Sequence, residues 1–168
     1  MATRWCIARA TAEGGFVGRY GHWDGHPESV GKTLWDAYFG HFHGDLKAML
    51  KFLIDDHPAG WSNICDAAWE LPAGFGDANK GPHCYCHGER HEEANTITDQ
   101  TAARTGCEYV YVFRSTPNGD IMKILKPMAP QWFRFTLGSG DPNARWNTIA
   151  VLALKNKDIQ PNWAEVGR

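Results

Sequence analysis

The amino-acid sequence predicts an α+β domain, a mostly antiparallel sheet with two helices inserted after an N-terminal β-hairpin. Two pairs of β-rich runs, 3–10 with 16–23 and 109–114 with 121–125, each flank a turn signal, as antiparallel hairpins do. Between these pairs, over 27–57, apolar residues recur at helical spacing. We therefore expect a single domain over 1–168, with its core within about 3–137.

The first hairpin turns at a Glu-Gly-Gly sequence, and its second strand carries several candidate functional residues. Side chains alternate along a strand, so Tyr20, His22 and Asp24 are expected on one face. Arg19 and Trp23 are expected on the other face.

Two helices are expected after this hairpin. Pro27 suits the first turn of the first helix, and Gly40 ends it. The second helix follows Gly44 and ends at His57-Pro58-Ala59-Gly60. The apolar residues at helical spacing are Val30, Leu34, Ala37 and Tyr38 in the first helix, and Leu46, Met49, Leu50 and Leu53 in the second.

The second half of the chain is less regular. Its strongest feature is Thr116-Pro117-Asn118-Gly119-Asp120, which predicts the turn of the second hairpin. The other expected segments are a surface loop over 61–79, a short strand over 83–87, a mobile flap or short helix over 88–105, a strand over 132–137, a strand or helix over 149–154, and a loosely ordered tail from about 156.

Composition indicates a soluble globular protein, with 43% hydrophobic and 21% charged residues. A formal net charge of -2 gives no electrostatic case for broad binding to nucleic acid or to an anionic membrane. No apolar run approaches the roughly 20 residues of a membrane span, and the N-terminus lacks a signal-peptide core. The five cysteines are irregularly spaced, which fits reduced thiols better than disulfides. We therefore expect a cytoplasmic protein.

The most informative segment is 19–27, Arg-Tyr-Gly-His-Trp-Asp-Gly-His-Pro, where a strand gives way to a helix. The side chains of His22 and Asp24 point the same way on a strand, and a carboxylate beside an imidazole can orient the imidazole for acid/base catalysis or for binding a ligand. Alternatively, Asp24 caps the helix and His22 hydrogen-bonds within the turn. Gly31-Lys32-Thr33 does not have the spacing of a phosphate loop, so Lys32 is kept only as a single charge that could line a site.

His83-Cys84-Tyr85-Cys86-His87, followed by His91, is the candidate metal segment. On a strand, Cys84 and Cys86 share one face, whereas structural zinc sites usually use cysteine pairs separated by two to four residues, with a second pair elsewhere. Buried thiols are therefore the simpler interpretation, and no cofactor is expected. If a metal binds, His87 and His91 are its expected ligands, together with a carboxylate. A Cys–His catalytic dyad stays open, because no nucleophile signature selects one.

A polar cluster follows this segment and includes Arg90 and Glu92. The guanidinium of Arg90 could bind a phosphate or carboxylate in its fork geometry. The alternative is a solvated, charged turn.

The chain resembles a family of small proteins found in many tailed phages and some actinobacteria. Segment 19–27 is similar to the family's Tyr-x-His-Trp-Asp-Gly-Tyr-Pro motif, with His26 in place of the family's second Tyr. The likeness runs from about residue 3 to 125, and 84–92 departs from the family pattern more than 19–27 does. The resemblance implies a phage accessory protein in the host cytoplasm, and small phage proteins often act against host defence.

The leading hypothesis is a binding module that sequesters a small anionic, nucleotide-derived ligand. Eight Trp favour stacking on a flat ligand, although a large aromatic core is the simpler reason for most of them. In this hypothesis Trp23 stacks on a base of the ligand, and Arg19 and Arg90 bind its phosphate. His22 and Asp24 bind the polar edges of the ligand. The full set of ligand-binding candidates is Arg19, His22, Trp23, Asp24, His26, Lys32, Arg90 and Glu92.

Two other hypotheses remain. The first is a small hydrolase or phosphodiesterase that uses His22 with Asp24, or a bound metal. The second is an inhibitor that docks on a host protein through an exposed Trp patch. Sequence leaves open whether the chain forms homo-oligomers.

Overall fold

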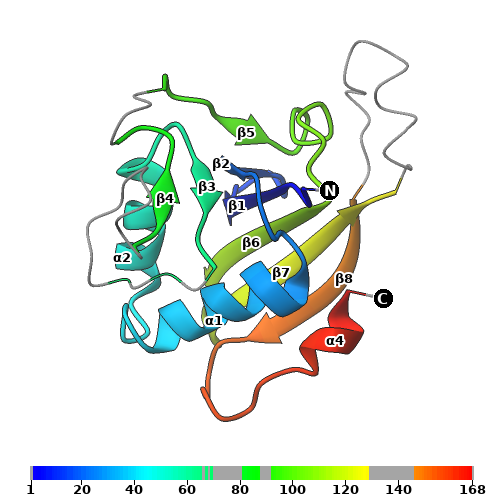
Figure 1. The fold of residues 1–168 in the computed structure, drawn as a ribbon. Coiled ribbons are helices and arrows are strands. Elements are labelled where there is room, and N and C mark those ends of the chain that lie inside the picture. Colours follow the sequence, from blue (N-terminus) through cyan, green and yellow to red (C-terminus); the bar gives the residue numbers. More distant parts are fainter. Residues whose placement is uncertain are drawn as a thin grey trace.

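The computed structural model describes residues 2–65, 67, 69, 81–87, 92–128 and 146–167, and Figure 1 shows their arrangement. The strands are β1 (Trp5–Ala10), β2 (Phe16–Gly21), β3 (Trp61–Asn63), β4 (His83–Cys84), β5 (Ile97–Thr98), β6 (Tyr109–Thr116), β7 (Gly119–Pro127) and β8 (Trp146–Ala153). The helical segments are η1 (Pro27–Gly31), α1 (Lys32–Phe39), α2 (Leu46–Leu50), η2 (Lys51–Asp55) and α4 (Trp163–Val166).

The eight strands form one mostly antiparallel sheet, in the order β4-β3-β2-β1-β6-β7-β8, with β5 pairing to β2. The β1–β2, β6–β7 and β7–β8 pairs are antiparallel. Two pairs are parallel: β1 with β6, and β2 with β3. The pairing of β1 with β6 joins the two hairpins in the middle of the sheet. Because the sheet is mostly antiparallel and is accompanied by short helices, the fold is α+β, as predicted.

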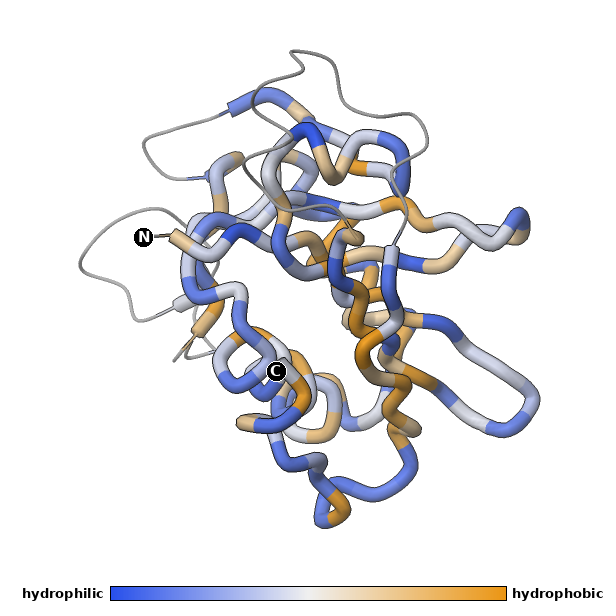
Figure 2. The backbone as a smooth tube through the Cα atoms, turned by 90° about the vertical axis from the view of Figure 1, so that its right-hand side faces the viewer, coloured by the Kyte–Doolittle hydropathy of each residue, from blue (hydrophilic) through white to orange (hydrophobic). Residues whose placement is uncertain are grey.

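The helices cover one face of the sheet (Figure 1). Alternation along β1 sends Trp5 and Ile7 to this face, where they join Leu34 of α1 and Leu53 of η2 in the larger hydrophobic core. Figure 2 shows hydrophobic stretches running through the middle of the molecule, while hydrophilic stretches lie mostly at its turns.

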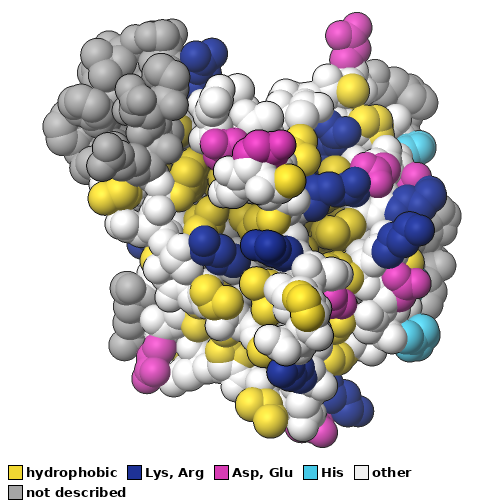
Figure 3. Space-filling model, turned by 180° about the vertical axis from the view of Figure 1, so that it is seen from behind, with side chains coloured by type: hydrophobic (Ala, Val, Ile, Leu, Met, Phe, Trp, Pro, Cys, Tyr) yellow, Lys and Arg dark blue, Asp and Glu magenta, His cyan; other side chains and the backbone are white. Residues whose placement is uncertain are grey.

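The opposite face of the sheet has a smaller core. Cys6 and Ala8 of β1 pack there with Ile97 of β5 and with Ala102, which lies in the turns after β5. Figure 3 views the molecule from this side and shows hydrophobic side chains gathered near its centre, with Lys and Arg side chains among them.

Local chemistry explains where the helices begin and end. Pro27 opens η1 at the first helical position, and the Gly40 N–H closes α1 on the Asp36 carbonyl at 2.8 Å. Asp45 caps α2, because its side chain accepts a 2.9 Å hydrogen bond from the Ala48 N–H. Both expected helices are therefore present, each as a π-helical segment joined to an α-helical one.

Several expectations need correction. The strand expected over 83–87 ends at Cys84, and bends follow it. The segment 88–105 contains β5 and a run of turns in its described part. The choice left open for 149–154 is decided in favour of a strand, since this segment falls in β8 up to Ala153. The strand expected over 132–137 lies outside the described residues.

The C-terminal tail also differs from its prediction. It was expected to be loosely ordered from about residue 156, but it contains α4. Trp163 of α4 is only 9% exposed and joins the larger core. The core therefore extends well beyond residue 137.

Candidate functional site

The 19–27 segment leaves the sheet by an irregular path. Strand β2 ends at Gly21, but the N–H groups of His22 and Trp23 still donate to the carbonyls of Trp61 and Ser62, at 3.1 and 3.0 Å. At Asp24 the chain turns, with φ of 58°, a left-handed conformation that Asp adopts more readily than most residues. His22 and Asp24 are therefore not successive members of one strand face.

Asp24 opens onto a cleft of about 900 Å³, here called the Asp24 cleft. This volume falls within the usual range for small-molecule sites, roughly 300–1,000 Å³. Besides Asp24, three segments line the cleft: the η1–α1 helix, the turn after α1, and the chain after β3. The lining residues are Asp24, Glu28, Ser29, Lys32, Thr33, Asp36, Gly40, His41, His43, Cys65, Ala67 and Trp69.

Charge in the Asp24 cleft is mainly negative. Asp24, Glu28 and Asp36 supply three carboxylates, and Lys32 is the lysine among the lining residues. The Lys32 Nζ lies 2.5 Å from the Asp36 carboxylate, one helical turn along α1. A ligand with hydrogen-bond donors suits this lining better than a densely charged anion.

The cleft also has an aromatic wall. The Trp69 and His41 rings lie nearly parallel, with centroids 6.2 Å apart and planes inclined by 29°. Trp69 also contacts the rings of Phe42 and Phe52 edge to face, at 6.2 and 6.4 Å, so the larger core supports it from behind.

His22 lines a different cleft of about 650 Å³, together with Tyr20, Tyr85, Glu92 and other residues. The Tyr20 Oη and His22 Nδ1 share a 2.7 Å hydrogen bond. Burial is the main cause that raises the pKa of Tyr20 to about 12, so the phenol is neutral at physiological pH. The predicted pairing of His22 with Asp24 in one pocket is therefore not found, since each side chain lines its own cleft.

Three potential metal ligands meet near β4, at the edge of the sheet. His57 follows η2, Cys84 ends β4, and His87 lies in the bend after β4. One ligand atom from each side chain lies within 4.8 Å of the other two. We call these three residues the His57 cluster.

Electrostatics in the His57 cluster disfavour a thiolate nucleophile. Burial raises the pKa of the Cys84 thiol to about 11, with a further contribution from Cys86. Burial also lowers the pKa of His57. Because both groups are then neutral at physiological pH, the cluster lacks the thiolate–imidazolium pair of a Cys–His dyad.

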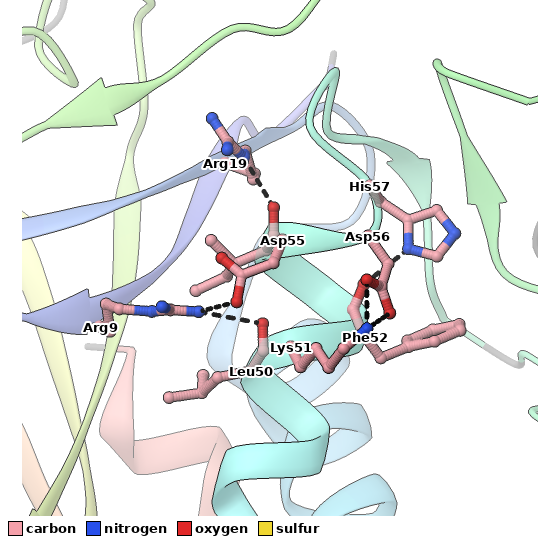
Figure 4. A network of polar contacts seen from close by, with 9 residues as sticks. Arg9, Arg19, Leu50, Lys51, Phe52, Asp55, Asp56 and His57 are labelled. Atoms are coloured by element: carbon pink, nitrogen blue, oxygen red, sulfur yellow. Dashed lines mark hydrogen bonds and ion pairs between the residues drawn. The ribbon is translucent and has the colours of Figure 1, made fainter.

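Arg19 has a structural role that differs from its predicted role in phosphate binding. Its Nε donates to the Ile54 carbonyl at 2.8 Å, and its Nη1 donates to the Thr96 hydroxyl at 2.7 Å. Figure 4 shows Arg19 and Arg9 reaching from the sheet to the end of η2. Arg19 thereby binds a carbonyl group in the last turn of η2, whereas Arg9 binds the Asp55 carboxylate and the Leu50 carbonyl.

The other predicted residues are dispersed. Trp23 is 46% exposed, and its ring meets the His22 ring edge to face at 4.7 Å. His26 occupies the position before η1, without a side-chain capping bond, and its Nε2 shares a 2.8 Å hydrogen bond with Thr3. Glu92 lines the cleft of His22. Arg90 and His91 lie outside the described residues.

Sequence reasoning missed two important residues. Trp69 fell within an expected surface loop, and no local pattern connects it to the first helix. His57 was assigned only to a helix end. The sequence does contain one indication of the His57 cluster: Cys84 and His87 are separated by two residues, a spacing typical of zinc ligand pairs.

Among the described residues, no helix has the length and apolar character needed to cross a membrane. Comparison with known proteins finds no family model that matches this chain. No curated protein and no solved structure matches it significantly.

Proposed function

We propose that this protein binds a small nucleotide-derived ligand in the Asp24 cleft and acts as a phage-type accessory protein that sequesters a signal of host defence. The observation that carries the binding role is the cleft itself, about 900 Å³ in volume and adjoining the 19–27 segment. The resemblance of the sequence to phage proteins supports the proposed role as a phage-type accessory protein.

The cleft offers complementary chemistry for a base and a sugar. Trp69 and His41 provide flat rings on which a base can stack. The carboxylates of Asp24 and Glu28 can accept hydrogen bonds from sugar hydroxyls or from exocyclic amino groups. The hydroxyls of Ser29 and Thr33 add further polar partners.

The charge balance restricts the anionic part of the ligand. Lys32 is the lining lysine, and it already pairs with Asp36. A triphosphate would place several negative charges beside three carboxylates, which is unfavourable. We therefore expect nucleosides, monophosphates or cyclic nucleotides to bind more tightly than triphosphates.

The test is calorimetric titration of the full chain with nucleosides and with cyclic, mono- and triphosphate nucleotides, followed by mass spectrometry of the bound and free fractions. Recovery of intact ligand from the denatured protein supports sequestration. Absence of heat and of any melting shift across the panel would overturn the proposal. Conversion of a ligand to a new product would replace it with an enzymatic function.

Asp24→Asn is the most informative variant of the cleft. Asn tolerates the left-handed backbone at this position, so the change removes a charge while keeping the turn. Hydrogen bonds to charged groups contribute about 1.5–3 kcal/mol, so we expect affinity to fall by about tenfold or more with little change in melting temperature. Glu13→Gln, in the exposed turn between β1 and β2, is the matched control and should bind as the unchanged protein does.

A small hydrolase is the second candidate, and the Tyr20–His22 hydrogen bond favours it. A histidine held by a phenol and facing a cleft with Glu92 has the components of a general acid or base. His22→Ala should abolish any turnover seen with the nucleotide panel. Unchanged turnover in this variant would show that His22 takes no part in the reaction.

A further inference from the structure

The His57 cluster has the ligand chemistry of a transition-metal site. Its three side chains come from two segments far apart in the sequence, yet their ligand atoms all lie within 4.8 Å of one another. The Cys84 Sγ and His87 Nδ1 are 3.3 Å apart. With bonds of about 2.0–2.1 Å to nitrogen and 2.3 Å to sulfur, a tetrahedral ion places neighbouring ligand atoms roughly 3.3–3.7 Å apart. Small side-chain movements would therefore bring all three atoms onto one ion.

We propose that His57, Cys84 and His87 bind a zinc ion and supply three of its ligands.

His57 is oriented as a metal ligand would be. Its Nδ1 shares a 2.6 Å hydrogen bond with the Phe52 carbonyl, and a carbonyl can only accept, so Nδ1 carries the proton. This hydrogen bond fixes the tautomer and leaves the lone pair on Nε2 free to coordinate. Figure 4 shows the second ring nitrogen pointing away from the end of η2. His57 is only 5% exposed, so its ring is also held by packing.

Cys84 and His87 form the second part of the site. The strand ends at Cys84, and the following bend brings His87 back toward the thiol. With the Cys84 Sγ and the His87 Nδ1 3.3 Å apart, this turn already directs both side chains to one point.

The donor set selects the class of metal. One thiolate with two imidazoles is a soft, nitrogen-rich set, which suits zinc and disfavours the oxygen-seeking cations magnesium and calcium. No other His, Cys, Asp or Glu within the described ranges joins the three ligand atoms.

The position of the site indicates what zinc would do for the fold. His57 follows the helical layer, whereas Cys84 and His87 belong to the edge of the sheet. A shared ion would connect these two layers. Zinc binding should therefore raise the melting temperature, because a ligand that binds only the folded state stabilises it.

The experiment begins with the full chain, stripped with a chelator and dialysed under reducing conditions. Zinc is then added, and its stoichiometry is measured by elemental mass spectrometry and its affinity by competition with a chromogenic chelator. Cobalt(II) substitution reports the ligands directly, because a thiolate gives a sulfur-to-cobalt charge-transfer band and a tetrahedral site gives intense d–d bands. We expect one ion per chain and both spectral features.

Variants then assign the ligands. Cys84→Ser should remove the charge-transfer band, whereas Cys86→Ser, two residues away, should keep it. Because Cys84 is buried and its replacement can impair folding, the exposed His87 provides a second test. Changes to residues that merely support a ligand weaken metal affinity about 10–100-fold, so His87→Gln should weaken zinc binding by about 100-fold or more, with the fold retained.

Three outcomes would overturn the proposal. One is less than stoichiometric zinc at micromolar free concentration. Another is an unchanged affinity in folded His87→Gln. The third is loss of the charge-transfer band in Cys86→Ser but not in Cys84→Ser. None of these outcomes affects nucleotide binding in the Asp24 cleft, which is measured separately.

Discussion

Gly21 shows how one residue without a side chain positions the 19–27 segment. A Cβ atom at this position would lie 2.0 Å from the Trp5 ring, so only glycine lets that ring lie against the end of β2. The Trp5 Nε1 donates a 2.9 Å hydrogen bond to the Trp23 carbonyl. Gly21 therefore allows the contact that holds the backbone just before Asp24.

Gly21→Ala is expected to destabilise the protein by about 2–3 kcal/mol, because the added methyl group overpacks a fully buried ring. Urea unfolding measures the change. Gly14→Asn is the control: its position has φ of +89°, which Asn tolerates better than most residues, and a Cβ atom added there would have nothing within 4 Å. Equal stability of Gly21→Ala and the unchanged protein would show that Trp5 does not pack against β2 in solution.

At the scale of the elements, two arginine side chains of the sheet, Arg9 and Arg19, hydrogen-bond the C-terminal end of η2. The Arg9 Nη2 donates to the Asp55 carboxylate at 2.7 Å, and Arg19 binds the Ile54 carbonyl. A positive charge near a helix C-terminus is favourable, and the hydrogen bond from Arg19 pairs a carbonyl group in the last turn of the helix (Figure 4). His57 follows directly, so this anchoring also positions the first ligand of the proposed zinc site.

Arg19→Met should separate the structural role of Arg19 from its predicted role in ligand binding. The variant keeps the apolar stem but loses the hydrogen bonds to Ile54 and Thr96, so we expect a loss of about 1–2 kcal/mol in unfolding free energy. Nucleotide affinity should stay unchanged in the folded variant. Arg114→Met, on the exposed part of β6, is the control. Weaker nucleotide binding without a loss of stability would instead support the predicted role of Arg19 in ligand binding.

At the scale of the whole molecule, the C-terminal segment completes the helical layer. Trp163 meets the Trp35 ring edge to face at 6.0 Å and lies close to Gly31, where an added Cβ atom would be 3.0 Å from the indole. Segments at opposite ends of the chain thus share one core.

Trp163→Ala is expected to cost about 3 kcal/mol, because truncating a packed Trp leaves a cavity against α1. Thermal and urea unfolding both report this loss. Ile159→Ala changes a side chain that is 72% exposed and should unfold as the unchanged protein does. If Trp163→Ala were equally stable, the tail would be loosely ordered, as the sequence predicts.

Local features of the sequence determined much of the fold. The β-rich runs 3–10 and 16–23 around a Glu-Gly-Gly turn predicted the first hairpin, and Pro27 and Gly40 predicted the limits of the first helix. The Pro-Asn-Gly turn predicted the second hairpin. These predictions are confirmed because turns, caps and periodic burial depend on residues only a few positions apart.

Only the tertiary structure decided which distant residues meet. It brought Trp69 against the turn that follows α1 and His57 close to Cys84. It also assigned Arg19 to a helix end and gave His22 and Asp24 separate clefts. Such contacts depend on how layers pack and on where the chain turns, as at Asp24, whose left-handed backbone breaks the strand alternation. The sequence by itself thus determined the two hairpins and the limits of the first helix, whereas packing between segments decided which side chains line the Asp24 cleft and which potential metal ligands lie close together.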